Sequence, residues 1–162
     1  MPNYFNFTRN QKLLIEGLNS FNVEYLVIGG LAVKRYYPKR KTKDLDILLP
    51  CDLASALQVA EIFRGLKMDE NPLKKWEEIL LTPCIRLACP DQVENEVDIL
   101  TSIDGIDFSV CYENSDDMKI GGLNFKVPSR SDLIQMKTIS LQSGNSTESH
   151  EKDRQDIYLL SK

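Results

Sequence analysis

Hydrophobic residues recur along this chain with two spacings, one typical of helices and one typical of buried strands. Thr8 and Gln11 have the spacing of a helix capping box, and Leu14, Leu18 and Phe21 follow on one helical stripe. Runs rich in β-branched and aliphatic residues come next and indicate strands. For the first half of the chain the pattern predicts a helix from Thr8, a strand over residues 23–28, a short helix over residues 31–37 that Pro38 stops, a strand over residues 45–49 and a helix over residues 53–65.

The helix over residues 53–65 has a sequence signal at each end. Asp52 is placed to cap its first turn, and Gly65 is placed to end it. Leu53, Leu57 and Ala60 recur at helical spacing and are expected on its inner face.

The second half of the chain has weaker hydrophobic patterns, but glycines and serines in it mark a turn and the start of a helix. Residues 66–82 are ambiguous, and residues 76–81 fit either a helix or a strand. Gly121-Gly122 indicates the tight turn of a hairpin, and Ser129 and Ser131 are candidate caps of a long helix. The elements expected here are strands over residues 85–89 and 97–100, a short helix or irregular chain over residues 103–111, a hairpin over residues 119–127, a helix through Leu141, a polar loop over residues 142–149 and a helix over residues 151–160.

The order of these elements predicts the fold class. Strands and helices interleave, so we expect an α/β (α+β) fold with a mixed sheet flanked by helices and a short C-terminal helical pair. A chain of 162 residues with 42% hydrophobic content can bury one core, and it contains no internal repeat. We therefore predict a single domain over residues 1–162.

Signals for a membrane or for export are missing from the sequence. No stretch approaches the roughly 18 uninterrupted apolar residues that a membrane-spanning helix needs. The first six residues contain neither the basic segment nor the apolar run of a signal peptide. We expect a cytoplasmic protein that does not contact a membrane.

Cysteine and histidine offer few catalytic possibilities. The four cysteines form no Cys-x-x-Cys pair, and without an export signal we expect reduced, mostly buried thiols rather than disulfides. The only histidine, His150, lies in a polar stretch beside Glu148 and Glu151. We therefore expect that any catalysis uses carboxylates and a metal ion.

The charge of the chain is unevenly distributed. The net charge of −4 does not favour nucleic-acid binding by the surface as a whole. However, six of the ten residues from Lys34 to Lys43 are Lys or Arg. This segment indicates a local anion site, with a solvated loop and a nucleic-acid contact as the alternatives.

Two aspartates follow the basic segment directly. Asp44 and Asp46 are two residues apart on a predicted strand, so their side chains are expected on the same face. Two carboxylates placed in this way repel each other unless a cation lies between them. Such oxygen ligands suit Mg²⁺ or Mn²⁺, which in proteins often also bind substrate phosphates. Taken alone, the pair also fits an exposed strand end.

A third aspartate strengthens the metal interpretation. Asp98 lies in the otherwise apolar run of residues 97–100, where an unpaired carboxylate is costly. If this strand lies beside the strand of Asp46, three carboxylates meet at one edge of the sheet, an arrangement that supports phosphoryl or nucleotidyl transfer. A paired, structural aspartate is the alternative for Asp98 alone.

A glycine pair precedes the basic segment. Gly29-Gly30 ends a predicted strand and precedes a predicted helix. A turn of this kind brings backbone N–H groups and the positive end of a helix dipole close to a phosphate. Many turns between a strand and a helix contain two glycines, so the pair alone is weak evidence for phosphate binding. The aspartates that follow strengthen this interpretation.

Together these motifs resemble the DNA polymerase β-like nucleotidyltransferase superfamily, in which a strand, Gly-Gly or Gly-Ser, Asp-x-Asp and a later Asp occur in this order. The form Arg-x-Thr-x-Asp-x-Asp of residues 40–46 is similar to small bacterial and archaeal members, including minimal nucleotidyltransferases and the toxins of abortive-infection systems. Those members often carry a Lys on the penultimate helix, as Lys137 does here, and a Lys-Asp-Arg-x-Asp run on the last helix, as residues 152–156 do. The resemblance covers roughly residues 8–160.

The resemblance implies a role for each matching residue. Asp44, Asp46 and Asp98 are the expected catalytic and metal-binding residues, with Asp98 as the base toward the acceptor hydroxyl. The expected nucleotide-binding residues are Gly29, Gly30, Arg40, Thr42, Lys137 and Lys152. One position departs from the pattern, because many active members have Ser where this chain has Gly30. Residues 152–156 also fit a plain solvated helix face.

The function implied is metal-dependent transfer of a nucleoside monophosphate from a nucleoside triphosphate (NTP), such as ATP, to a hydroxyl, with release of pyrophosphate. The cofactor is Mg²⁺ or Mn²⁺, and the acceptor is a protein, a tRNA end or a small molecule. A partner protein or a second copy of the chain is expected to complete the acceptor site. The alternative is a non-catalytic nucleotide-binding protein, or an interaction protein of a toxin–antitoxin pair, with the same fold.

Overall fold

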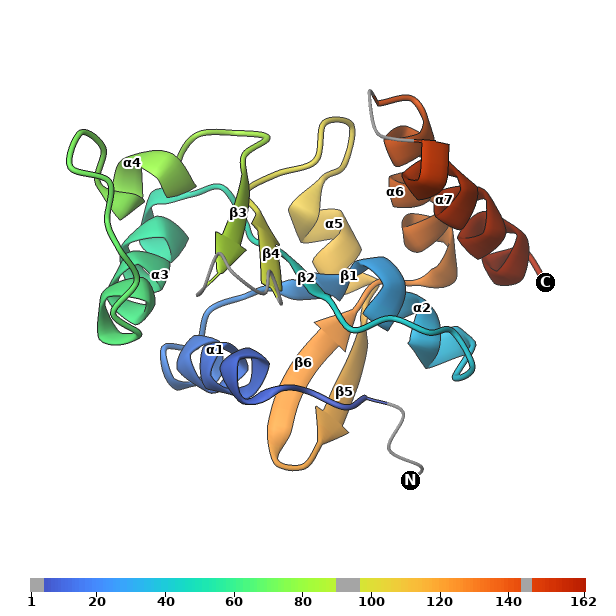
Figure 1. Cartoon of the computed structure of the whole chain (residues 1–162), viewed down its shortest axis with the longest axis horizontal. Helices are drawn as coiled ribbons and strands as arrows, with labels where there is room; N and C mark the ends of the chain where they lie inside the picture. Colours follow the sequence, from blue (N-terminus) through green and yellow to red (C-terminus); the bar gives the residue numbers. More distant parts are fainter. Residues whose placement is uncertain (1–4, 90–96, 144–146) are drawn as a thin grey trace.

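A four-stranded sheet separates two groups of helices in the computed structural model, which describes residues 5–89, 97–143 and 147–162 (Figure 1). The elements are, in chain order, α1 (Arg9–Ser20), β1 (Leu26–Ile28), α2 (Gly29–Tyr36), β2 (Leu45–Leu48), α3 (Leu53–Gly65), α4 (Trp76–Leu80), β3 (Arg86–Cys89), β4 (Val97–Leu100), α5 (Phe108–Glu113), β5 (Asp116–Ile120), β6 (Leu123–Val127), α6 (Arg130–Leu141) and α7 (Thr147–Leu160). Within the described ranges, no helix combines the length and the apolar character needed to cross a membrane.

The sheet is mixed, as the order of the predicted elements indicated. Its strands lie in the order β1-β2-β4-β3, and β5 and β6 form a separate antiparallel hairpin. The central pair, β2 and β4, is parallel, whereas β1 and β3 lie antiparallel to their neighbours. The predicted α/β (α+β) fold class with flanking helices is therefore confirmed.

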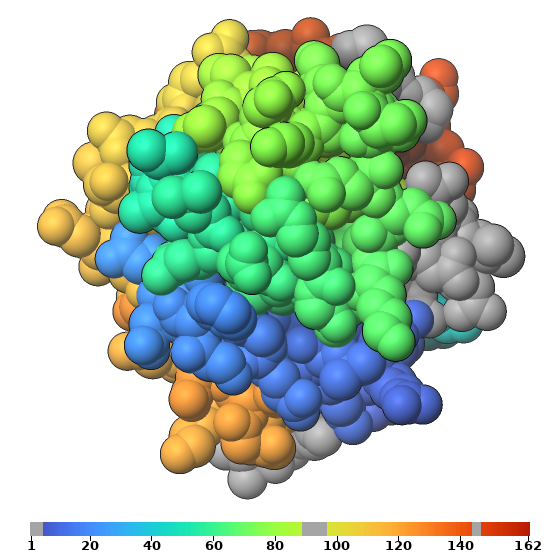
Figure 2. All heavy atoms as spheres, turned by 90° about the vertical axis from the view of Figure 1, so that its left-hand side faces the viewer, coloured from blue at the N-terminus to red at the C-terminus, as the bar shows by residue number. Residues whose placement is uncertain are grey.

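The two faces of the central strands differ in chemistry. Leu45, Ile47 and Ile99 point into the core and are at most 1% exposed, because alternate residues of a strand face opposite sides. Asp46 and Asp98 lie on the other face and are half-buried. Figure 1 shows α3 and α4 on one side of the sheet and α6 and α7 on the other, and Figure 2 shows α1, α3 and α4 packed side by side.

Helix α1 begins as the sequence predicted. The Thr8 backbone N–H donates to Gln11 Oε1 at 3.0 Å, and the Gln11 backbone N–H donates to Thr8 Oγ1 at 3.3 Å, which completes the capping box. Gln11 is fully buried, and its Nε2 also donates to the carbonyl oxygen of Lys43 at 2.8 Å. The start of α1 therefore holds the chain immediately before Asp44. The prediction for Phe21 is wrong, because the helix ends at Ser20 and the Phe21 side chain is 43% exposed.

Helix α3 has the predicted ends but a different inner face. Asp52 caps it through its Oδ1, which accepts a hydrogen bond from the Ser55 backbone N–H, and Gly65 is its last residue. Leu53 and Leu57 are 58% and 49% exposed, so their placement on the inner face was wrong. Ala60 is buried as predicted, and the buried face also contains Ala56, Val59 and Phe63, whose ring packs edge-on against Trp76 of α4. Both stripes have helical spacing, and the packing of α1 and α4 on α3 selects between them.

Several other boundaries differ from the sequence-based expectation. Strand β1 is shorter than residues 23–28, and α2 begins at Gly29 rather than at residue 31. Residues 76–80 form a helix, and the short helix expected within residues 103–111 starts later, at Phe108. Helix α7 begins at Thr147, four residues before the predicted start, and residues 144–146 of the predicted loop lie outside the described residues. Local patterns define element types better than element ends.

The hairpin and α6 form as predicted, although β5 begins at Asp116 rather than at residue 119, and the chain that joins them anchors α2. Ser129 caps α6, since its Oγ accepts a hydrogen bond from the Asp132 backbone N–H at 3.2 Å. The Tyr36 hydroxyl donates to the Pro128 carbonyl oxygen at 2.8 Å, and the Arg130 guanidinium lies 4.9 Å from the centre of the Tyr36 ring. These contacts fix the end of α2 against the beginning of α6.

The described cysteine side chains are free thiols in different environments. Cys111 is buried, Cys51 is half-buried and Cys84 is exposed. The expectation of a buried thiol is therefore confirmed for Cys111 and wrong for Cys84.

Candidate functional site

The parallel pairing of β2 and β4 brings the aspartates of the two motifs together. Asp46 lies directly opposite Asp98 in the register of the two strands, so both side chains are on the same face. Asp44 does not belong to β2 as predicted, because it precedes the first strand residue and is exposed. All three aspartates nevertheless line one pocket of about 460 Å³.

Burial and pairing together make ionisation of these carboxyl groups costly. Burial and, to a lesser extent, the nearby charge of Asp98 raise the pKa of Asp46 to about 6, although Arg86 and Lys137 act in the opposite direction. Burial also raises the pKa of Asp98, although the Arg86 guanidinium, 3.4 Å from Asp98 Oδ2, partly offsets this effect. A positive charge bound between the two carboxylates would favour their ionised forms.

The carboxylates fit a divalent cation that also binds phosphate. In the part of the chain that the structure describes, no group of three or more His, Cys, Asp or Glu side chains is placed to hold a metal ion. Mg²⁺ commonly binds to one or two carboxylates and completes its octahedral coordination with phosphate oxygens and water. The paired Asp46 and Asp98, with their raised pKa values, are suited to this mode of binding.

Gly29 allows the Asp46 carboxylate to lie over the start of α2. The glycine has a φ of +70°, and a Cβ atom at this position would lie 2.1 Å from Asp46 Oδ2. The left-handed conformation and the close approach each require glycine. The Asp46 carboxylate and the N-terminus of α2, a favourable place for anions, therefore share one corner of the site.

Gly29→Ala is expected to lower the stability of the protein and to displace the Asp46 side chain. The φ of +70° alone costs about 1–2 kcal/mol for a residue with a Cβ atom, and the contact with Asp46 adds to it. Urea denaturation measures the loss. Gly65→Ala is the matched control, because nothing lies within 4 Å of its Cβ position, and we expect it to change stability little. Equal stabilities for the two variants would contradict the close approach.

Gly30 leaves space that the Thr42 side chain occupies. A Cβ atom at Gly30 would lie 2.9 Å from Thr42 Oγ1 and 3.0 Å from Thr42 Cβ. Thr42 therefore occupies the space beside the first turn of α2 that a larger residue at position 30 would need. Both residues line the same pocket as the three aspartates.

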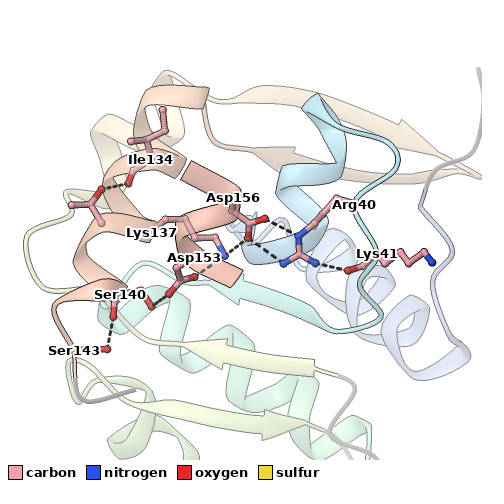
Figure 3. Close-up of polar contacts among 9 residues, drawn as sticks. Arg40, Lys41, Ile134, Lys137, Ser140, Ser143, Asp153 and Asp156 are labelled. Atoms are coloured by element: carbon pink, nitrogen blue, oxygen red, sulfur yellow. Dashed lines mark hydrogen bonds and ion pairs between the residues drawn. The ribbon is translucent and has the colours of Figure 1, made fainter. Parts of the chain in front are cut away.

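The remaining predicted nucleotide-binding residues form a charged wall of this pocket, and each of the three already has a carboxylate partner. Arg40 forms an ion pair with Asp156 at 2.7 Å, and Lys137 contacts Asp153 at 3.2 Å and Asp156 at 3.0 Å (Figure 3). Lys152 is 62% exposed and lies 3.7 Å from Glu148 on its own helix. Arg40, Lys137 and Lys152 all line the pocket with the aspartates.

The run of residues 152–156 is not a plain solvated helix face. Asp153 is 5% exposed and Asp156 is fully buried, whereas Arg154 is exposed. Although burial raises the pKa of Asp156, the hydrogen bond from Arg40 and the charge of Lys137 outweigh this effect, so its pKa is lower than usual. Asp156 therefore remains a charged partner inside the protein.

Sequence reasoning missed Arg86 and undervalued Asp156. Arg86 begins β3 and reaches Asp98 on the neighbouring β4, a contact that depends on a strand pairing the sequence does not state. Asp156 was noted as part of a motif, but its spacing from Asp153 did not distinguish a buried face from an exposed one.

A second pocket adjoins the first and has a more apolar lining. It has a volume of about 440 Å³ and shares Asp46, Arg86 and Lys137 with the carboxylate pocket. Ile28, Leu133 and Met136 contribute apolar surface to it. The face of the sheet that carries Asp46 is therefore open both to a charged pocket and to one with a mixed polar and apolar lining.

The fold is similar to a solved structure. An antigenic nucleotidyltransferase-like protein from Paracoccidioides brasiliensis aligns over 91% of this chain and 72% of its own, with a TM-score of 0.52 and 20% sequence identity. No protein-family model matches the chain, and no curated protein sequence matches it. At this level of identity the similarity establishes a nucleotidyltransferase-like fold.

Proposed function

We propose that the protein is a metal-dependent nucleotidyltransferase that moves a nucleoside monophosphate from an NTP such as ATP to a hydroxyl. The observation that carries the proposal is the pairing of Asp46 with Asp98 in register on one face of the sheet, in a pocket that basic residues also line. Paired carboxylates attract a divalent cation, and basic side chains attract phosphates. The nucleotidyltransferase-like fold agrees with this assignment.

Each residue of the pocket has a role in this proposal. Asp44 and Asp46 would hold the Mg²⁺ or Mn²⁺ of the triphosphate, which when bound would neutralise its charge, and Asp98, paired with Asp46, would help to hold a second ion. The N-terminus of α2, at Gly29 and Gly30, faces the phosphates. Arg40, Thr42, Lys137 and Lys152, which line the same pocket, would contact the triphosphate.

The reaction that fits this site is an in-line displacement at the α-phosphorus. Asp98 accepts the proton of the acceptor hydroxyl as its oxygen bonds to the α-phosphorus. The bond from the α-phosphorus to the bridging oxygen breaks, and pyrophosphate leaves. The raised pKa of Asp98 suits a group that must hold a proton during the reaction.

The assignment of the protein to a superfamily rests on the sequence motifs. We propose membership of the DNA polymerase β-like superfamily, among its small bacterial and archaeal members, on the spacing of Gly29-Gly30, Asp44, Asp46 and Asp98. A protein, a tRNA end and a small molecule are the acceptor classes to be tested. A partner protein or a second copy of the chain is proposed to complete the acceptor site.

Transfer of label tests the function directly. The protein is incubated with each NTP labelled on the α-phosphate, with Mg²⁺ or Mn²⁺, and with candidate acceptors, the protein itself included. Label on an acceptor together with released pyrophosphate is the expected result. Binding of NTP without transfer to any acceptor would favour the non-catalytic alternative, a nucleotide-binding or toxin–antitoxin protein of the same fold. Absence of both binding and transfer would contradict the proposal.

Gly30→Ser is expected to weaken NTP binding, although Ser is common at this position in the superfamily that the sequence resembles. The new Cβ atom would displace Thr42, which lies within 3.1 Å of it through three atoms. Adding Thr42→Gly removes those atoms, so the double variant is expected to bind more tightly than Gly30→Ser alone but more weakly than the unsubstituted protein, because the contact of Thr42 with the triphosphate is lost. Isothermal titration with NTP and Mg²⁺ measures both variants. A Gly30→Ser protein that binds NTP as tightly as the unsubstituted protein would contradict the proposed contact between positions 30 and 42.

A further inference from the structure

Four charged side chains form a network where the basic loop meets the two C-terminal helices (Figure 3). Arg40 comes from the loop between α2 and β2, Lys137 from α6, and Asp153 and Asp156 from α7. The two carboxylates are almost completely buried, with exposed fractions of 5% and 0%. The two positive and two negative charges balance.

Asp156 lies at the centre of this network. Its Oδ1 accepts a hydrogen bond from Arg40 Nε at 2.7 Å, and its Oδ2 accepts one from Arg40 Nη2 at 3.1 Å. The same Oδ2 lies 3.0 Å from Lys137 Nζ. One carboxylate therefore binds the guanidinium at two points and the ammonium at a third.

Asp153 supports the same arrangement from one turn earlier on α7. It contacts Lys137 Nζ at 3.2 Å and accepts a hydrogen bond from Ser140 Oγ at 2.7 Å. An ammonium group has three N–H donors, and the two aspartates account for two contacts. The Lys137 side chain is thus held from the α7 side.

Stability alone is a weak reason for burying these charges. Removing two charges from water costs about as much as their attraction returns, and well-packed apolar residues commonly stabilise a core as well or better. A buried ion pair does, however, fix the position and direction of each partner. Arg40 and Lys137 both line the pocket that contains the three aspartates.

We propose that Asp156 is a positioning residue for NTP binding, whose two oxygens hold Arg40 and Lys137 at fixed places on the pocket wall, where both contact the triphosphate. This inference rests on the proposed function. Long cationic side chains lose conformational freedom when they bind a ligand, and side chains that are ordered beforehand lose less. The carboxylate also ties the basic loop to α7, so the C-terminal helix takes part in forming the site.

The test compares Asp156→Asn with Asp156→Glu, using Mg²⁺–ATP as the probe. Asn keeps an acceptor oxygen but loses the charge that binds both cations, whereas Glu keeps the charge. We expect the dissociation constant and the KM for ATP to rise about tenfold in the Asn variant, with kcat at saturation within about threefold. The Glu variant is expected to recover most of the affinity. Arg154→Gln, an exposed substitution on the same helix, is the control and should bind as the unsubstituted protein does.

A purely structural role for Asp156 gives a different result. The Asn variant would then show a lower melting temperature and a smaller active fraction with an unchanged KM, and this outcome overturns the inference. If the Asn variant does not fold, the double variant Arg40→Met, Asp156→Leu replaces the pair with apolar side chains, and ATP affinity like that of the unsubstituted protein would likewise overturn it. Absence of Mg²⁺–ATP binding in the unsubstituted protein would instead contradict the proposed function itself.

Discussion

Asp98→Asn is expected to lower the rate of nucleotidyl transfer by about 10² or more, the usual scale for losing a positioned general base. Asn has nearly the same size and keeps one acceptor oxygen, but it carries no charge and cannot accept the proton of the acceptor hydroxyl. Affinity for NTP is expected to stay within about tenfold, or about 1.4 kcal/mol, because Asp44 and Asp46 remain to hold the metal-bound triphosphate. The effect should therefore fall on the chemical step.

The structure supplies a competing explanation that the same variant tests. Asp98 is paired with Arg86 at 3.4 Å, and its side chain is only 14% exposed. If its role is to pair with Arg86 for stability, the variant has a lower melting temperature and its folded fraction keeps full activity. Melting temperature, NTP affinity and label transfer are measured on one preparation, with the exposed Asp104→Asn as control. A destabilised but fully active Asp98→Asn protein would remove most of the support for an enzyme.

Asp46→Asn is expected to abolish divalent-dependent NTP binding and, without metal, to stabilise the protein at neutral pH. Burial raises the pKa of Asp46 from an ordinary 3.8 to about 6, so the folded protein holds a proton that the unfolded chain has released between these pH values. The contribution of this group to stability therefore falls as the pH rises from about 4 to about 6 and stays low above that. A pKa raised by this much lowers the free energy of unfolding above pH 6 by roughly 2 to 3 kcal/mol.

Melting temperatures across this pH range, with and without Mg²⁺ and NTP, measure both effects. At pH 7.5 without metal, we expect Asp46→Asn to melt about 5 °C above the unsubstituted protein, since the uncharged amide removes the cost of ionisation. Mg²⁺ with NTP should raise the melting temperature of the unsubstituted protein more at pH 7.5 than at pH 5, and should not affect the variant. An Asp46→Asn protein that is less stable than the unsubstituted protein at pH 7.5, or that responds to Mg²⁺ and NTP as the unsubstituted protein does, would contradict the assignment of Asp46 as a buried metal ligand.

Local features of this protein are determined by its sequence. Thr8 with Gln11 defines the start of α1, and Asp52 with Gly65 defines both ends of α3, as predicted. The hairpin turn at Gly121-Gly122 also lies where the glycines predict it. Each of these signals involves residues a few positions apart, whose hydrogen bonds and backbone preferences do not depend on the rest of the molecule.

The candidate site contains features that local sequence patterns determine and features that depend on the tertiary structure. The motifs identified Asp46 and Asp98 because a carboxylate in an apolar strand is unusual in any fold. That the two lie directly opposite each other depends on the parallel pairing of β2 with β4, a register that no local pattern specifies. Leu53 and Leu57 were predicted incorrectly on the inner face of α3 for a related reason, since two stripes had helical spacing and the packing of α1 and α4 selected one of them.

Only the tertiary structure decided the role of the C-terminal helix. Arg40 and Asp156 are 116 positions apart, and although both belong to sequence motifs, nothing in the sequence predicted that they contact each other. Their pairing requires α7 to pack on α6 and both helices to lie beside the loop that follows α2. Such a contact results from the way whole elements pack, so its physical cause is spread over the core and is absent from the spacing of any one segment.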